Sequence, residues 1–347
     1  KGGAGFKPIA DYIHNLGLKF GIHIMRGIPR QAVHAAAPIQ GTSKTARDIA
    51  HSFSICSWNT DMYGVNPNAD GAQEYYDSLF DLYASWGVDF VKVDDICITE
   101  FKPHDLYSAK GEIEMIRKAI DKCGRPIVLS LSPGPALLEQ AEHLSRHANM
   151  WRMTGDFWDN WPQLYNMFEK CHQWSPYVKE GCWPDCDMLP LGRIEINNRN
   201  DGGTGRNTCF TKDEQITMMT LWSIFRSPLM LGTELRGLDD WTLSLITNEE
   251  VIRVLKHSYG ARQIMRTDDT VVWKSKDEDG SIYVAFFNTS FSKTYPSVSY
   301  RQLGLNGEYE VRDLWTHEGL GTVTERLGTE LNPHGAALLR LREVTVI

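Results

Sequence analysis

The first two thirds of the chain repeat one pattern: an amphipathic helix, a glycine, a short apolar run and a polar loop. Apolar residues recur at helical spacing before Gly17, Gly87 and Gly124, and each glycine is placed to end its helix. An apolar run follows each glycine, at residues 18–25, 88–93 and 126–131. Continuous apolar runs that alternate with helices are typical of parallel strands covered by helices. The pattern therefore predicts consecutive βαβ units.

Three weaker segments bring the number of predicted strands to six. They lie at residues 150–153, near 187–189 and at 228–232. A capping box, Thr211-Lys212-Asp213-Glu214, opens the helix before the last of them. Long loops follow the strands, where a (β/α)₈ barrel keeps its active site. We therefore expect residues 1–260 to form an α/β, (β/α)₈ TIM barrel holding strands three to eight, with two strands expected before Lys1.

The pattern changes near residue 261. Short segments rich in β-branched and aromatic residues lie at 271–273, 282–287, 309–315 and 336–341, separated by turns such as Asp279-Gly280 and Asn306-Gly307. Such segments are typical of antiparallel strands. Residues 261–347 are therefore predicted to form a C-terminal antiparallel β-sandwich domain.

Composition excludes several classes of partner. The formal net charge is −8 and the sequence contains no cluster of basic residues, so nucleic acid and anionic membrane surfaces are poor partners. No apolar run reaches the 18 residues that a bilayer span needs. Seven cysteines without a CxxC pair argue against a structural zinc site built from cysteines. We expect no metal and no organic cofactor.

The strongest chemical motif is Lys92-Val93-Asp94-Asp95, at the end of an apolar run. Strand alternation places Lys92 and Asp94 on one face. An interior lysine and aspartate favour each other's ionised form, with an attraction of about 4 kcal/mol at roughly 4 Å and a dielectric near 20. The aspartate suits a nucleophile or a metal ligand, and the alternative is a buried ion pair that only stabilises the strand.

A second motif, Trp151-Arg152-Met153-Thr154-Gly155-Asp156, follows another strand. Asp156 is a candidate general acid and Arg152 a candidate ligand of substrate hydroxyls. The alternative is a loop cap with a surface salt bridge.

Weaker candidates lie after other predicted strands. The loop 182–189 is dense in acids and aromatics and contains Asp187 and Met188, but it is equally compatible with an Asx-turn beside a core tryptophan. His23 ends the first apolar run, a position where a histidine is more often structural than a ligand. Ser132 follows a strand, but no G-x-S-x-G elbow surrounds it.

These motifs, in this order, resemble the melibiase family of clan D glycoside hydrolases, which includes α-galactosidases and α-N-acetylgalactosaminidases. The resemblance rests on ADYIHNLGLKFGIH, WGVDFVKVDD, WRMTGD, WPDCDML, MTLWSIFRSPLMLGTEL, VRDLW and PHGAALLRL, and it extends along nearly the whole chain. It implies a (β/α)₈ barrel followed by an antiparallel β domain.

The resemblance also implies roles for individual residues. Asp94 would be the nucleophile and Asp156 the acid/base. Lys92 would bind the sugar 3- and 4-hydroxyls and Arg152 the 2-position. The pocket would also be lined by His23, Ser132, Asp187 and Met188.

Two departures from the family bear on specificity and compartment. Ser132 takes the position of a family glutamate in α-galactosidases and a serine in α-N-acetylgalactosaminidases, which favours a 2-acetamido sugar. Cys97 lies one residue later than a family cysteine whose partner loop here has none. We expect that disulfide to be absent, a weak indication of a cytoplasmic protein, with export left open.

The sequence therefore predicts a retaining α-glycosidase acting on terminal α-galactosyl or α-N-acetylgalactosaminyl groups by double displacement. A β-L-arabinopyranosidase of the same family is one alternative, because this sugar differs from galactose only in lacking the exocyclic carbon. Another is a metal-dependent barrel lyase or epimerase with Asp94, Asp95 and Asp187 on Mg²⁺ and Lys92 as base. A third is a sugar-binding protein without catalysis. The expected partner is a carbohydrate substrate, and a homo-oligomer is left open.

Overall fold

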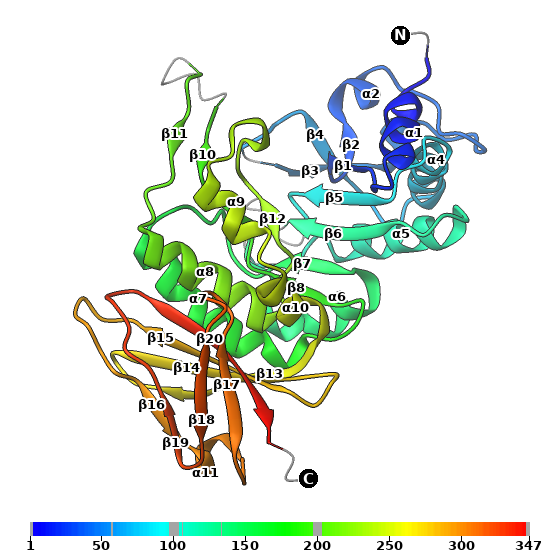
Figure 1. The fold of residues 1–347 in the computed structure, drawn as a ribbon. Helices are drawn as coiled ribbons and strands as arrows, with labels where there is room; N and C mark the ends of the chain where they lie inside the picture. The colour runs from blue at the N-terminus through cyan, green and yellow to red at the C-terminus, as the bar shows by residue number, and fades with distance from the viewer. Residues whose placement is uncertain are drawn as a thin grey trace. The chain divides into compact units, whose positions relative to one another are not determined.

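The computed structural model describes residues 3–56, 58–96, 104–105, 107–132, 134–196 and 203–344. The chain forms two compact units (Figure 1). Unit 1 contains Lys1–Gly155 and Lys179–Trp183, and unit 2 contains Asp156–Val178 and Pro184–Ile347. The domain boundary expected near residue 260 falls inside unit 2 and stays a prediction.

Unit 1 is built on a parallel sheet in the order β1-β5-β6-β7-β8. Its strands are β1 (Gly21–Met25), β5 (Phe90–Asp94), β6 (Val128–Ser132), β7 (Met150–Arg152) and β8 (Trp183–Asp185). The first residue of β8, Trp183, donates its N–H to the carbonyl of Asn149 at 2.9 Å. Val91 and Val93 of β5 are fully buried, as the apolar run predicts.

Helices connect the strands of unit 1. They are α1 (Lys7–Asn15), α2 (Arg30–His34), α3 (Ala46–Ile49), α4 (Ala72–Ser85), α5 (Lys110–Lys122), the 3₁₀ turn η1 (Leu138–Gln140) and α6 (Ala141–His147). Gly17, Gly87 and Gly124, which the sequence placed at helix ends, all have positive φ. A small antiparallel sheet, β2-β4-β3, lies between α1 and α4 in sequence and contains Ile28–Pro29, Met62–Val65 and Ala50–Ile55.

The first part of unit 2 is mainly helical. Its helices are α7 (Trp161–Trp174), η2 (Ser175–Tyr177), α8 (Lys212–Phe225), η4 (Leu235–Gly237), α9 (Asp240–Ile246) and α10 (Glu249–His257). The predicted capping box opens α8, because Thr211 accepts from the N–H of Glu214 and Glu214 from the N–H of Thr211. Helix α8 is buried on nearly every side, packing on α7, α10, β15 and β20. Two short pairs complete this part: β9 (Met188–Leu189) with β12 (Met230–Leu231), in parallel, and β10 (Arg193–Ile194) with β11 (Arg206–Asn207).

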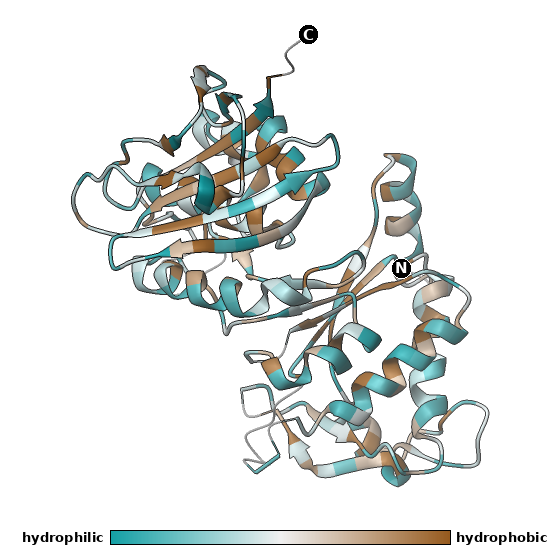
Figure 2. Cartoon of the chain, turned by 90° about the horizontal axis from the view of Figure 1, so that it is seen from below, coloured by the Kyte–Doolittle hydropathy of each residue, from teal (hydrophilic) through white to brown (hydrophobic). Residues whose placement is uncertain are grey.

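The rest of unit 2 is an antiparallel sheet in the order β13-β14-β15-β20-β17-β18. The strands β16 and β19, from the same part of the chain, form a separate antiparallel pair. The strands are β13 (Ser258–Arg266), β14 (Thr270–Asp277), β15 (Ile282–Asn288), β16 (Ser297–Ser299), β17 (Tyr309–Asp313), β18 (Gly319–Val323), β19 (Arg326–Gly328) and β20 (Ala336–Glu343), with the helix α11 (Tyr300–Leu303). Hydrophobic colouring is concentrated on the long strands in Figure 2. The core contains Val284 and Leu339, which are opposite each other in β15 and β20.

All six strands predicted for the barrel are present, and the structure adds one that was not predicted. The segment expected near 187–189 is preceded by an additional strand, β8, which begins at Trp183. The four β-domain segments form β14, β15, β17 and β20, whereas β13, β16, β18 and β19 were not predicted. Within the described part of the chain, no helix combines the length and the apolar character that a membrane span requires.

The core of the antiparallel sheet supplies a stability test. Leu339 is fully buried, whereas Leu320 on β18 is 49% exposed. Leu339→Ala should lower the free energy of unfolding by about 2–5 kcal/mol, because it removes buried methyl groups and leaves a cavity. Leu320→Ala is the matched control and should change it by less than about 0.5 kcal/mol. Urea unfolding followed by tryptophan fluorescence measures both, and equal losses would contradict the assigned core.

Candidate active site

The carboxyl ends of the strands in unit 1 bring together five predicted site residues. Asp94 is the last residue of β5, and it lies opposite Met25 of β1 and Ser132 of β6. One level lower, Lys92 lies opposite His23 and Ser130. Arg152 is the last residue of β7. In barrels of this type, polar groups at this end of the strands serve catalysis.

Two groups position the Asp94 carboxylate. The Nε2 atom of His23 lies 3.2 Å from one carboxylate oxygen, and the N–H of Asp95 donates to the other at 2.8 Å. The side chain of Asp94 is 25% exposed, so a reacting group can reach it. An oriented, accessible carboxylate of this kind can act as a nucleophile or bind a cation.

The expected ion pair between Lys92 and Asp94 is not formed. Both residues lie in the described part of the chain, and the side-chain partner found there for Asp94 is His23. Register does not distinguish the two side chains, because His23 and Lys92 lie opposite each other in neighbouring strands. The Asp94 carboxylate is directed towards the neighbouring strand, where His23 Nε2 lies 3.2 Å from it. His23, which the sequence treated as more often structural, thus contacts the candidate nucleophile.

A buried charge network lies behind Asp94. The guanidinium of Arg26 is 3.0 Å from Asp95 Oδ2 and 3.0 Å from Glu112 Oε1, and Glu112 also accepts from the Tyr76 hydroxyl. The side chains of Arg26 and Glu112 are 2% and 4% exposed. Removing one partner of such a buried pair typically costs about 3–5 kcal/mol. The network therefore stabilises the turn at the end of β5.

The network holds Asp95 in an unusual state. Its backbone has φ of 52°, a left-handed conformation that is uncommon outside glycine. Burial raises the pKa of the Asp95 carboxyl to about 6, although the positive charge of Arg26 opposes the shift. Sequence reasoning assigned no role to Arg26 or Glu112; the one available signal was a charged residue directly after the apolar run 18–25.

Ser132 and Arg152 form a second buried contact at the same strand ends. The guanidinium of Arg152 donates to Ser132 Oγ at 3.1 Å, and the two residues are 5% and 1% exposed. A buried arginine held in this way is positioned to donate hydrogen bonds to a polar ligand.

The remaining predicted residues belong to unit 2. Asp156 is exposed and follows the Thr154–Gly155 segment after β7. The carboxylate of Asp187 accepts from the N–H of Phe157 at 2.8 Å, and the Asp187 carbonyl accepts from the indole of Trp222 at 3.2 Å. Asp187 is buried, and its hydrogen bond from the N–H of Phe157 positions the backbone directly after Asp156. Met188 begins β9 and pairs with Met230.

Asp159 adds another anchor that the sequence did not indicate. Its carboxylate forms a two-point ion pair with Arg206 and accepts from the N–H of Cys209. Burial would raise the pKa of Asp159, but these hydrogen bonds outweigh it and lower the pKa to about 2. The segment that follows Asp156 is thus held at Phe157 and at Asp159.

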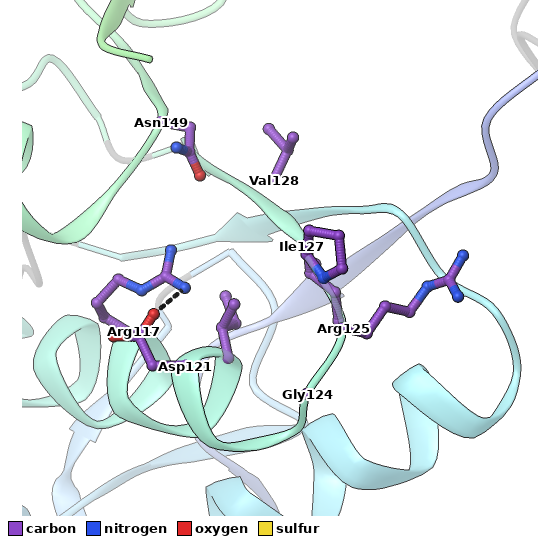
Figure 3. Close-up of a pocket in the computed structure, with 9 residues that line it drawn as sticks. Arg117, Asp121, Gly124, Arg125, Ile127, Val128 and Asn149 are labelled. Carbon is purple, nitrogen blue, oxygen red and sulfur yellow. Dashed lines mark hydrogen bonds and ion pairs between the residues drawn. The ribbon is translucent and has the colours of Figure 1, made fainter.

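A hollow at the opposite strand ends of unit 1 is separate from this cluster. It measures about 470 Å³ and is lined by Arg117, Ile120, Asp121, Gly124, Arg125, Pro126, Ile127, Val128 and Asn149 (Figure 3). Val128 is the first residue of β6, whereas Ser132 is its last. Residues at this end of a barrel contribute to stability rather than catalysis. We therefore place the candidate site at the carboxyl ends.

The described cysteines are free thiols. Cys171 and Cys186 are both buried, with their Sγ atoms 3.5 Å apart. Burial raises the pKa of Cys186 well above its ordinary value. Cys97, on which the expectation of an absent disulfide rests, lies outside the described residues.

The raised pKa of Asp95 generates a pH prediction. The folded state holds its proton up to about pH 6, whereas an unfolded aspartate releases it near pH 4. Between these values the folded state binds more protons, so the contribution of Asp95 to stability falls as pH rises, by at most about 3 kcal/mol.

Asp95→Asn removes this titration. We expect the melting temperature of the wild type, minus that of the variant, to decrease between pH 4 and pH 6. Thermal melts at half-unit pH intervals measure the difference. A difference that is constant or rises over this window would contradict the assignment.

Two protein-family models match the chain in succession. The model described as "Alpha galactosidase A" matches residues 64–257, and the one described as "Alpha galactosidase C-terminal beta sandwich domain" matches residues 267–341. Among curated proteins, alpha-galactosidase 2 of Arabidopsis thaliana is 27% identical over 97% of this chain and 72% of its own length. The alpha-galactosidase of Cyamopsis tetragonoloba is 28% identical over 96% and 69%.

Solved structures include more similar proteins. A β-L-arabinopyranosidase of glycoside hydrolase family 27 from Geobacillus stearothermophilus is 61% identical, with a TM-score of 0.95, over 100% of this chain and 78% of that one. A putative α-N-acetylgalactosaminidase from Bacillus halodurans is 49% identical, with a TM-score of 0.88, over 99% and 79%. The chain therefore belongs to the alpha-galactosidase (melibiase) family of glycoside hydrolases, family 27, and the predicted class of a barrel with a C-terminal antiparallel β-sandwich is confirmed.

Proposed function

We propose that this glycoside hydrolase removes terminal β-L-arabinopyranosyl groups with retention of anomeric configuration. The observation that carries the proposal is the 61% identity to the Geobacillus β-L-arabinopyranosidase along the whole chain, against 49% for the putative α-N-acetylgalactosaminidase. The curated alpha-galactosidases are only 27% and 28% identical. β-L-arabinopyranose keeps the ring stereochemistry of α-galactose and lacks only the exocyclic carbon, so the same catalytic groups serve both sugars.

In the proposed reaction, Asp94 attacks the anomeric carbon while Asp156 donates a proton to the leaving oxygen. The bond between the sugar and the aglycone breaks, and a glycosyl ester forms on Asp94. Asp156 then takes a proton from water, which attacks the same carbon and releases the sugar. The contacts from His23 and the Asp95 N–H to Asp94 support the proposed role of Asp94 as nucleophile, since they orient both of its carboxylate oxygens.

The other predicted residues are proposed to bind the sugar. Lys92 would contact the 3- and 4-hydroxyls, and Arg152, held by Ser132, the 2-position. His23, Asp187 and Met188 would line the pocket. The anchoring of Phe157 by Asp187 supports a defined position for the neighbouring Asp156.

A second candidate substrate is the α-N-acetylgalactosaminide. Ser132 favours it, because a serine beside Arg152 is shorter than the glutamate of α-galactosidases and leaves more room at the 2-position. The 49% identity to the putative α-N-acetylgalactosaminidase also supports it.

A substrate panel distinguishes the candidates. The full-length protein should be assayed on nitrophenyl β-L-arabinopyranoside, α-D-galactopyranoside and α-N-acetylgalactosaminide. We expect kcat/KM to be highest for the arabinoside, by about 10–200-fold over the galactoside, the range that one added group in a fitted pocket produces. A higher kcat/KM for the galactoside or the N-acetylgalactosaminide would contradict the proposed arabinopyranoside specificity. It would leave the assignment as a glycoside hydrolase intact.

Variants of the two carboxylates test the mechanism. Asp94→Asn should lower kcat on the order of 10⁴-fold or more, because no glycosyl ester can form. Asp156→Ala should cost about 10²–10⁴-fold on substrates with poor leaving groups, less on nitrophenyl glycosides, and azide should restore part of the rate. Asp11→Asn, an exposed aspartate on α1, is the control and should retain full activity.

Covalent labelling identifies the nucleophile directly. An activated fluoro-sugar should attach to Asp94, as read by mass spectrometry of peptides. A label on Asp95 or Asp185 would overturn the assignment.

Turnover at 25 °C should be unaffected by a chelator, whereas loss of activity would favour the metal-dependent lyase or epimerase. The ion pair of Asp95 with Arg26 already opposes that alternative, since it directs the Asp95 carboxylate to a guanidinium.

A further inference from the structure

Three potential metal ligands meet between two helices of unit 1. Glu114 lies on α5, and His143 and His147 lie one turn apart on α6. One ligand atom of each side chain lies within 4.8 Å of the other two. Residues four apart on a helix share one face, which is the arrangement that two histidines need to bind one ion.

The closest pair already approaches the geometry of a metal site. Glu114 Oε1 lies 3.0 Å from His143 Nε2. Two ligands bound about 2.1 Å from a tetrahedral zinc ion lie roughly 3.4 Å apart, so this pair needs to separate by only a few tenths of an ångström. The two imidazole rings stack with their centroids 4.1 Å apart.

Outer contacts orient both imidazoles. His147 Nδ1 lies 2.8 Å from the carbonyl oxygen of His143, which can only accept, so Nδ1 carries the proton and Nε2 carries the lone pair. His143 Nε2 faces the Glu114 carboxylate, which can only accept, so Nε2 carries the hydrogen that a bound ion would replace. His143 Nδ1 lies 2.7 Å from the Tyr107 hydroxyl, which can accept a hydrogen bond from Nδ1–H once the ion occupies Nε2. Partners of this kind on the second ring nitrogen are typical of histidines that bind metals.

Burial and charge are compatible with a cation. All three side chains are partly buried, and the side chain of His143 is 12% exposed. Burial lowers the pKa of His143 from the ordinary value of a histidine. Glu114 supplies one negative charge. Lys110, which is exposed and one turn earlier on α5, adds a positive charge that partly offsets the negative charge of Glu114.

We propose that Glu114, His143 and His147 bind one Zn²⁺, with water in the fourth position. Two imidazoles and a carboxylate are ligands that zinc accepts, and imidazole is a poor ligand for Mg²⁺ or Ca²⁺. The ion would join α5 to α6 and, through Tyr107, hold the segment that enters α5. Its role is to stabilise unit 1 and not to take part in hydrolysis.

Binding is tested on the full chain after removal of any affinity tag and of metal with EDTA. Titration calorimetry with ZnCl₂ should show one saturable site. At about 100 times the dissociation constant, zinc should raise the melting temperature by a few degrees. Co²⁺ should give the visible absorption of a tetrahedral complex. Absence of a stoichiometric site would overturn the proposal.

Variants locate the ion. His147→Gln removes the imidazole but keeps a polar side chain, and it should weaken zinc binding at least about tenfold, as should Glu114→Gln. His172→Ala, an exposed histidine on α7 of unit 2, is the matched control and should bind zinc like the wild type. Equal affinity of His147→Gln and wild type, or a loss in His172→Ala, would contradict the assigned ligands.

Crystallography keeps the proposal testable if a variant does not fold. Anomalous scattering at the zinc edge from wild-type crystals soaked in ZnCl₂ should give a peak between the three side chains. A peak elsewhere, or none, would overturn the proposal. None of these measurements depends on hydrolysis, so their outcome is independent of the proposed substrate.

Discussion

The buried guanidinium of Arg26 is the interaction on which the candidate site depends most. It joins the end of β1 to Asp95, directly after β5, and to Glu112 on α5. A charge buried to this degree persists only when partners satisfy it. The same contacts hold Asp95 in a left-handed conformation, from which its N–H donates to the Asp94 carboxylate. A structural ion pair therefore determines the orientation of the proposed nucleophile.

The family relationship separates the reaction from the choice of sugar. Retaining hydrolysis needs two carboxylates, which this chain supplies as Asp94 and Asp156 in the proposed roles. The sugar is selected by groups around them, and relatives of this chain carry names for three different sugars. Ser132 and Arg152 form one such group, because their buried hydrogen bond determines which atoms are presented at the proposed 2-position.

The proposed zinc site and the charge network both attach to α5. Glu112 faces Arg26, whereas Glu114, two residues later, faces His143 on α6. Because residues two apart on a helix do not share a face, α5 can contact the strand ends on one side and α6 on the other. This helix connects the region after the proposed nucleophile to two different neighbours, which explains why two of its acidic residues lie in buried or half-buried positions.

Local patterns in the sequence were sufficient for the elements and for the identity of the candidate groups. Apolar runs predicted all six barrel strands, three of them after helix-ending glycines, and segments rich in β-branched and aromatic residues predicted four strands of the β domain. Motif order pointed to Asp94 and Asp156. Contacts between distant segments were decided only by the tertiary structure. The partner of Asp94 is His23 and not Lys92, although these two residues lie opposite each other in neighbouring strands, so the direction of the side chains and not the strand level decides the contact. Arg26 and Glu112 meet across 86 residues. Periodicity reports which face of an element is buried, but not which charged groups the packing of several elements brings within 3 Å of one another.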